Sequence, residues 1–249
     1  MSATATTTGR SSARVPGEAT PSAPATSARA GRASRAGGVA ALVKAGTYVL
    51  GFGVMGAYLG PRGFTDAQGD PAASLAFLLD HQVAMYLWYL ALYVIGGTAL
   101  VVLTLALHER LRSAPAAVLL RTSTSFGLIW SGLLLASGLI ALVGQRAVVD
   151  LAASDVDTAA STWSAVGVVQ DALGGGIEIV GAVWVLLVSI AGIRSGLLSR
   201  GPSVLGITLG GIGACTLLPA AADGAASLFG MGFVVWFLWI AATLLRRRA

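Results

Sequence analysis

The sequence predicts an all-α integral membrane protein, a bundle of six transmembrane helices with both termini in the cytoplasm. Three observations support this fold class. Of the 249 residues, 55% are hydrophobic and only 11% are charged, whereas a soluble domain carries roughly 25% charged residues. Six apolar segments are each about 20 residues long, which is enough to cross a hydrocarbon core about 30 Å thick. Basic residues concentrate in alternate connections, as a fixed membrane topology requires.

The first element is a polar segment, residues 1–38. It is rich in Ser, Thr and Ala, contains no aromatic residue, and carries five arginines against Glu18 as its one acidic residue. A segment with so few large apolar side chains has little to bury, so we expect a disordered cytoplasmic tail. Its arginines favour contact with anionic lipid head groups on the cytoplasmic side. Membrane lipids are therefore the partner that the sequence predicts.

The remainder of the chain, residues 39–249, is expected to form one transmembrane domain. Lipid offers no partner to unpaired backbone groups, so every span should be a helix. The fifth span has the weakest support, because it is rich in glycine and Pro219 lies near its end. The predicted spans are Ala40–Leu59, Val83–Leu107, Thr122–Val143, Gly174–Ile193, Val204–Ala222 and Ala226–Leu245.

Two connections between the spans are long enough to form structure of their own. Asp70 followed by Pro71 is a good helix start, because the carboxylate can cap free backbone N–H groups and proline presets φ. We therefore expect a short helix that lies on the second span or runs into it. The pattern Asp-x-Ala-Ala-Ser occurs at Asp70–Ser74 and again at Asp157–Ser161. Chance or shared capping chemistry explains this match better than a repeat of hairpins.

Charge indicates how the spans are oriented. The first, third and fifth connections carry two basic residues, Arg62 and Arg146, together with eight aspartates. The other side carries 14 basic residues, among which we count Lys44. The positive-inside rule then places both termini in the cytoplasm.

No motif with a catalytic mechanism occurs in the sequence. Phosphate loops, zinc-protease motifs and the serine-hydrolase elbow are missing, so we predict no enzyme activity, no cofactor and no metal. The single cysteine, Cys215, cannot form an internal disulfide. No cluster of basic and aromatic residues suggests a groove for nucleic acid.

Glu178 is the sharpest candidate for a functional residue. It lies about five residues inside the fourth predicted span, where a carboxyl group is costly and usually faces a bundle interior or a wet cavity. Asp171 and several glycines follow helical spacing with it, so one face is polar and small. This face either lines a ligand or proton site or packs closely against another helix. Asp80 and His81, at the outer mouth of the second span, complete the candidate site, although water or lipid heads can also satisfy His81.

Small and aromatic residues predict how the helices pack. Small residues recur at i, i+4, for example at Gly206 and Gly210, and allow helices to approach closely. With 33 glycines, we interpret these pairs as internal packing rather than dimerisation, and the oligomeric state stays open. Four tryptophans lie deep in the spans and should pack or face lipid: Trp130, Trp184, Trp236 and Trp239.

Three apolar runs resemble one family of bacterial multi-pass membrane proteins, the domain of unknown function 4386 family. The runs are Trp184–Leu198, Leu205–Gly211 and Phe233–Ile240, and the stretch from Asp70-Pro71 to His81 fits as well. The resemblance covers about residues 40–248 and implies six or seven membrane helices of unknown activity, with no catalytic residues. Together with a composition rich in Ala, Gly and Arg, it predicts a protein of a bacterial inner membrane.

Three functions are compatible with these observations. The first is a non-enzymatic structural or regulatory membrane component. The second is a small transporter or exporter that uses the acidic face around Glu178. The third, a membrane-embedded enzyme, is a remote alternative because the motifs are missing. A cavity that reaches Glu178 would favour transport, whereas a sealed bundle would favour the structural role.

Overall fold

A computed structural model describes residues 23–112, 117–175, 178–196 and 198–246, and the secondary structure in these ranges is helical. The first α-helices are α1 (Ala23–Val54), α2 (Phe64–Ala67), α3 (Pro71–Asp80), α4 (Gln82–Tyr89) and α5 (Gly96–Leu111). They are followed by α6 (Ala117–Ala152), α7 (Val156–Gln170), α8 (Ile179–Ser195), α9 (Arg200–Ala214) and α10 (Ala222–Leu245). Short π-helices are η1 (Met55–Leu59), η3 (Leu90–Ile95) and η4 (Asp171–Gly175), and 3₁₀ turns are η2 (Gly60–Arg62) and η5 (Cys215–Leu217).

Five helical stretches are long and apolar enough to cross a membrane. They are Gly31–Arg62, Gln82–Leu111, Ala117–Ala152, Val156–Ser195 and Gly224–Leu245. The first four stretches contain the first four predicted spans and are longer than them. The fifth stretch matches the sixth predicted span almost residue for residue. The helical fold of the described residues is therefore confirmed, with five stretches that could cross a membrane by their length and composition.

The predicted fifth span differs from the others. Helix α9 has 15 residues, and the chain then tightens into the 3₁₀ turn η5. Fifteen residues rise only about 22 Å, which is less than a hydrocarbon core of about 30 Å. The helix passes into η5 at Cys215, and Pro219, which lacks a backbone N–H, does not allow it to continue. The count of six spans is thus not confirmed.

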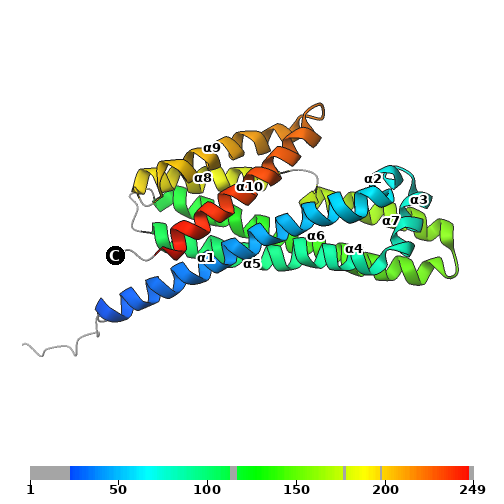
Figure 1. Cartoon of the computed structure of the whole chain (residues 1–249), viewed down its shortest axis with the longest axis horizontal. Helices are drawn as coiled ribbons and strands as arrows, with labels where there is room; N and C mark the ends of the chain where they lie inside the picture. The colour runs from blue at the N-terminus through cyan, green and yellow to red at the C-terminus, as the bar shows by residue number, and fades with distance from the viewer. Residues whose placement is uncertain (1–22, 113–116, 176–177, 197, 247–249) are drawn as a thin grey trace, which may run out of the picture.

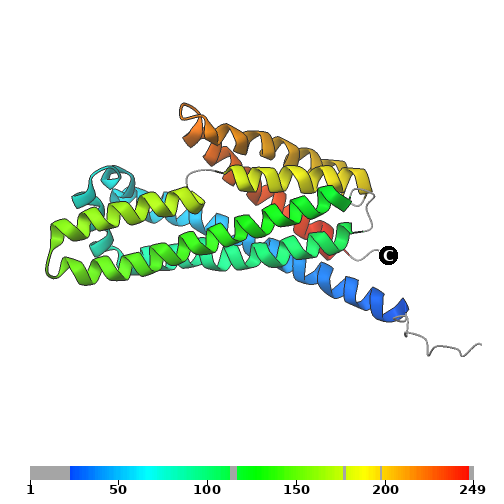
Figure 2. The same ribbon diagram turned by 180° about the vertical axis from the view of Figure 1, so that it is seen from behind.

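Helix α6 is the axis of the molecule. It has 36 residues and runs along the whole bundle, with α5 on one side and with α7 and then α8 following each other along another (Figures 1 and 2). Helices α8, α9 and α10 gather around one half of α6, at the end where the chain terminates (Figure 1). Helices α2, α3 and α7 cover the other half.

The two ends of this bundle carry opposite charges. We call the end formed by α2, α3, α7 and the last turns of α6 the acidic end, and the opposite end the basic end. Aspartates of the acidic end are Asp66, Asp70, Asp80, Asp150, Asp155 and Asp157. Arginines at helix termini of the basic end are Arg110, Arg112, Arg121, Arg194, Arg200 and Arg246. The predicted alternation across six spans and the side that faces the cytoplasm both stay predictions.

Two local expectations need correction. Helix α1 begins at Ala23, so the second part of the expected tail is helical, and the Ser34 hydroxyl donates to the Leu244 carbonyl at 2.7 Å. The tail before Ala23 lies outside the described residues. Capping by Asp70 is confirmed, since its carboxylate accepts from the backbone N–H of Ala72 at 2.9 Å. The second copy of the pattern does not share this role, because Asp155 and not Asp157 caps α7.

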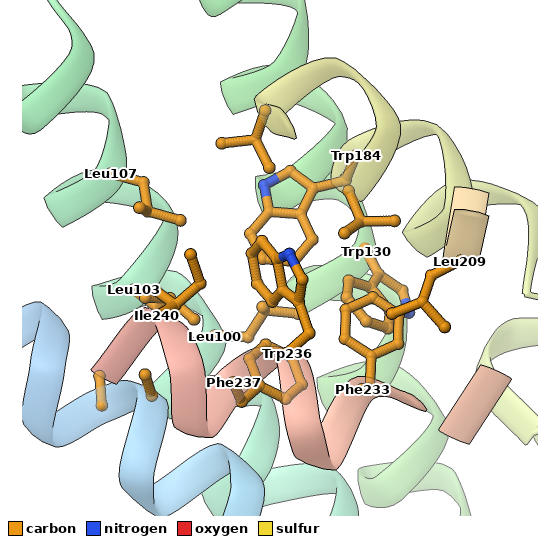
Figure 3. Close-up of a cluster of buried hydrophobic side chains, with 14 of the residues drawn as sticks. Leu100, Leu103, Leu107, Trp130, Trp184, Leu209, Phe233, Trp236, Phe237 and Ile240 are labelled. Atoms are coloured by element: carbon orange, nitrogen blue, oxygen red, sulfur yellow. The ribbon is translucent and has the colours of Figure 1, made fainter. Parts of the chain in front are cut away.

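Aromatic side chains fill the core between α6, α8 and α10. Figure 3 shows Trp184 and Trp236 against one another, with Phe233 beside them. The Trp184 and Trp236 ring centroids are 5.4 Å apart in a T-shaped contact, a favourable geometry for aromatic rings. Trp184 and Trp236 are at most 1% exposed and Trp130 is 4% exposed. The packing interpretation is thus confirmed for these three, while Trp239 is exposed on the surface.

Glycines allow the close helix contacts in this half of the molecule. A Cβ atom added at Gly210 would lie 2.8 Å from the Leu186 Cβ and 3.1 Å from the Ala182 carbonyl oxygen. At Gly181 a Cβ atom would lie 2.7 Å from the Trp130 ring. The small-residue spacing therefore marks internal packing between α8 and its neighbours, as predicted.

Candidate functional site

Two neighbouring cavities lie beside the aromatic core. The smaller has a volume of about 270 Å³ and is lined by residues of α1, η3, α10 and the start of α8. The larger has a volume of about 510 Å³ and lies under α2 and α3 at the acidic end. We call them the charged cavity and the aromatic cavity. Met55, Trp88 and Tyr93 line both, so the two cavities adjoin.

Lys44 supplies the positive charge of the charged cavity. It lies within the first membrane-crossing stretch, on α1, and is only 2% exposed. Its ammonium nitrogen lies 4.7 Å from the centroid of the Tyr48 ring and 5.9 Å from that of Trp130, within the range of a cation–π interaction. A Cβ atom at Gly96 would lie 3.1 Å from this nitrogen. The glycine therefore leaves the space that the ammonium group needs.

Glu178 supplies the negative charge. It is the N-cap residue of α8, with its backbone at φ −91° and ψ 12°, and its side chain does not cap the helix. The backbone N–H of Glu178 donates to the Thr216 hydroxyl at 3.1 Å, which ties this point to the α9–α10 hairpin. With the backbone fixed in this way, the carboxyl group is free to line the charged cavity.

The two charges share one cavity without pairing directly. Within the described residues, the ion pair between Arg112 and Glu109 is the one formed, and Lys44 and Glu178 form none. Their side chains nevertheless border the same space. A buried charge without a partner is costly, so a space between two such charges is suited to hold water or a polar ligand.

The aromatic cavity has a different lining. Aromatic rings from α2, α3, α4 and α7 surround it, together with two carboxylates, Asp70 and Asp171. Its aromatic residues are Phe64, Phe77, Trp88, Tyr89, Tyr93 and Trp163. Such a combination of apolar walls and a few polar groups is typical of small-molecule sites.

A short hydrogen-bond network connects α7 with the wall between the cavities. The Gln170 side-chain amide donates to the Tyr93 hydroxyl at 2.9 Å and to the Ser137 hydroxyl at 3.1 Å. The Ser137 hydroxyl in turn donates to the Gln170 carbonyl at 2.9 Å. Gln170 and Ser137 are both buried, so this network fixes Tyr93, which lines both cavities.

The three π-helices all border the cavities. Met55 of η1 and Tyr93 of η3 line both, and Asp171 of η4 lines the aromatic cavity. A π-helical turn is energetically poorer than an α-helical one and occurs often at functional sites. The irregular backbone therefore coincides with the hollow part of the molecule.

The structure separates the four predicted site residues. Glu178 and Asp171 line neighbouring cavities, whereas Asp80 and His81 line neither. The His81 ring packs on Phe77, with centroids 4.5 Å apart. Glu178 and Asp171 also do not share one continuous helix face as expected, because η4 and the cap of α8 intervene.

Lys44 is the site residue that the sequence analysis missed. It was counted with the basic residues of the cytoplasmic side, but the structure buries it inside the bundle. The available signal was its position within an otherwise uncharged predicted span, where an ionisable residue indicates function by default. Among the described residues, no group of three or more His, Cys, Asp or Glu side chains could hold a metal ion.

Comparisons with family models, with curated proteins and with solved structures find no match to this chain. The resemblance to the domain of unknown function 4386 family thus stays a prediction.

Proposed function

We propose that this protein is a transporter for a small solute, which reaches the charged cavity by way of the aromatic cavity. The observation that carries this proposal is the cavity shared by Lys44 and Glu178. Charged groups inside membrane spans commonly mark a solute or ion pathway. A bundle with a purely structural role does not need a cavity lined by two opposite charges.

The proposal includes a topology. The protein would cross a bacterial inner membrane six times, with α9 and η5 together as the fifth span and with both termini in the cytoplasm. The opposite charges of the two ends support this orientation. The aromatic cavity would then open on the outer side. No enzymatic role is proposed.

Alternating access is the property that tests transport. Ser227 of α10 lines the charged cavity and is exposed to it. In a Cys215→Ser background, a Ser227→Cys variant should react with an impermeant thiol reagent from outside in intact cells. It should also react from the cytoplasmic side in inside-out vesicles.

Leu228 provides the matched control, since it is the next residue, is 60% exposed and does not line the cavity. A Leu228→Cys variant should face lipid and stay unlabelled. Labelling of Ser227→Cys from the outside alone would indicate a receptor. Labelling from neither side would exclude transport and favour the structural or regulatory role.

The topology is tested in the same background. Cysteines introduced at the exposed positions Thr65, Ala153 and Gly224 should be labelled in intact cells. A cysteine at Ser199, between α8 and α9, should be labelled only after the membrane is opened. Labelling of Ser199→Cys in intact cells would exclude the six-span arrangement.

A further inference from the structure

The charged cavity presents two opposite charges from separate elements. Lys44 is on α1, and Glu178 is at the start of α8. Both line the same space of about 270 Å³, and in the described part of the chain they form no ion pair with each other. The separation leaves room for a ligand between the two groups.

The charges limit which ligand can be bound. A simple cation would satisfy Glu178 and leave Lys44 buried beside an added positive charge. A simple anion would pair with Lys44 and leave Glu178 buried beside an added negative charge. Buried charges are tolerated when each has a partner of opposite sign. A zwitterion is the class of ligand that provides both partners at once.

The remaining walls are largely apolar. Tyr48, Phe52, Leu92 and Leu134 line the cavity with Met55 and Trp88. Tyr48 also contributes its ring face to the Lys44 ammonium group, which holds that group in place. A ligand that fills the space should therefore carry an apolar group next to its charges.

We propose that the charged cavity binds a small zwitterion with an apolar substituent, with its anionic group at Lys44 and its ammonium group at Glu178. This inference rests on the proposed transport function and names its substrate class. Amino acids with aromatic or aliphatic side chains have this chemistry. The phosphoethanolamine head group of a lipid shares the pair of charges but not the adjacent apolar group.

Three probes of nearly equal shape test the proposal. L-Phenylalanine carries both charges, 2-phenylethylamine carries only the ammonium group, and 3-phenylpropanoate carries only the carboxylate. Binding to the purified full-length protein in nanodiscs is measured by titration calorimetry. Phenylalanine should bind at least tenfold more tightly than either probe with one charge. Glycerophosphoethanolamine should bind no more tightly than those two probes.

Variants assign each charge to its partner. Lys44→Met should weaken phenylalanine binding at least tenfold and leave 2-phenylethylamine binding unchanged or tighter. Glu178→Gln should weaken phenylalanine binding equally and spare 3-phenylpropanoate. Asp80→Asn is the control, because Asp80 is exposed and lines neither cavity. If one single variant fails to fold, the double variant Lys44→Met with Glu178→Leu removes both charges together and should not bind phenylalanine.

The outcomes separate this inference from the proposed function. Equal binding of phenylalanine and 2-phenylethylamine would overturn the zwitterion and leave a transporter for cations. Tightest binding of glycerophosphoethanolamine would assign the cavity to lipid head groups. Absence of binding by all three phenyl probes up to millimolar concentration would also overturn the inference. None of these results depends on the labelling of Ser227→Cys, which tests transport alone.

Discussion

The aromatic core and the two cavities use similar side chains to opposite effect. In the core, Trp130, Trp184 and Trp236 are at most 4% exposed, and their rings contact one another. Around the cavities, Trp88 and Tyr93 border open space instead. Glycines close the gaps in the first region, whereas π-helices occur beside the second. The number of aromatic side chains therefore does not decide whether a helical bundle contains a cavity. In this molecule the cavities occur where the helical backbone is irregular and where charged groups lie beside the rings.

Truncation of a core tryptophan should have the largest effect on stability. Trp184→Ala removes a side chain that is 1% exposed and touches four other aromatic rings. We expect a loss of about 3–5 kcal/mol in the free energy of unfolding, because the hole cannot collapse fully. Trp88→Ala should cost less than half of that, since one face of the ring already borders a cavity. Circular dichroism during titration with SDS measures both, and equal losses would contradict the difference between the regions.

Added volume should separate the regions in a second way. Gly181→Ala places a methyl group 2.7 Å from the Trp130 ring, and overpacking of this kind costs about 1–3 kcal/mol. Gly53→Ala is the matched change on α1, where nothing lies within 4 Å of the added atom. It should be neutral or slightly stabilising, because alanine favours a helix over glycine. A thermal melt of the two variants side by side checks the prediction, which fails if Gly53→Ala is the more damaging change.

Loss of one charge in the cavity should affect stability little. If Lys44 and Glu178 were sealed in a dry core, Glu178→Gln would strand the lysine and cost about 3–5 kcal/mol. If the charged cavity admits water to the Lys44 ammonium group, as the proposed function requires, the lysine is hydrated there, and we expect a loss of about 1 kcal/mol or less. Solute flux should nevertheless fall strongly, because the carboxylate is gone. SDS unfolding and flux in proteoliposomes, measured on the same preparation, separate these cases.

The smallest expected effect concerns the exposed cap of α7. The Thr158 hydroxyl donates to the Asp155 carboxylate at 2.6 Å, and the Thr158 backbone N–H donates to it at 3.0 Å. The hydroxyl first, and then the backbone N–H, lower the Asp155 pKa below its ordinary value of 3.8. The resulting stability is therefore fully present above the ordinary value and is lost as the pH falls through the lowered one.

Hydrogen exchange in the first turn of α7 measures this effect. Asp155→Asn should reduce protection slightly at neutral pH and should match the original protein in strong acid. Thr158→Val removes only the hydroxyl donor and should reproduce part of the loss. A difference that grows as the pH falls would have the wrong sign for this capping interaction.

Apolar length and local capping could be predicted from the sequence with good accuracy. The last span was expected to end at Leu245, where α10 ends, and Asp70 was expected to cap the helix that begins at Pro71. Both features depend on neighbours within one turn. The end of α9 differs from the prediction, because apolarity continues past Ala214 whereas a 3₁₀ turn and then Pro219 end the helix.

Of the two charged residues in the candidate site, only Glu178 could be predicted from the sequence. Glu178 stands out because a carboxyl group inside a span is energetically costly. Lys44, which lines the same cavity, is far away in the chain, and its charge alone assigns it to the basic side. That Lys44 of α1 and Glu178 at the start of α8 line one cavity has no signature in a periodic pattern. The π-helical turns are equally silent, since Leu90–Ile95 is as apolar as an ordinary helix. Cavities are formed by the mismatch of several helices and therefore appear only in three dimensions.

The length of α6 has a practical consequence. Its 36 residues rise about 54 Å, and even at a tilt of 40°, the upper end of the usual range, they would span about 41 Å against a hydrocarbon core of about 30 Å. Part of α6 must therefore extend beyond the acyl chains, and the turn between α6 and α7 is one of its two ends. A chain of 25.1 kDa offers few landmarks for electron cryomicroscopy. Fusion of a rigid soluble domain at the exposed turn between Ala152 and Val156, or an antibody fragment raised against this turn, would give particle images the asymmetric feature that their alignment needs.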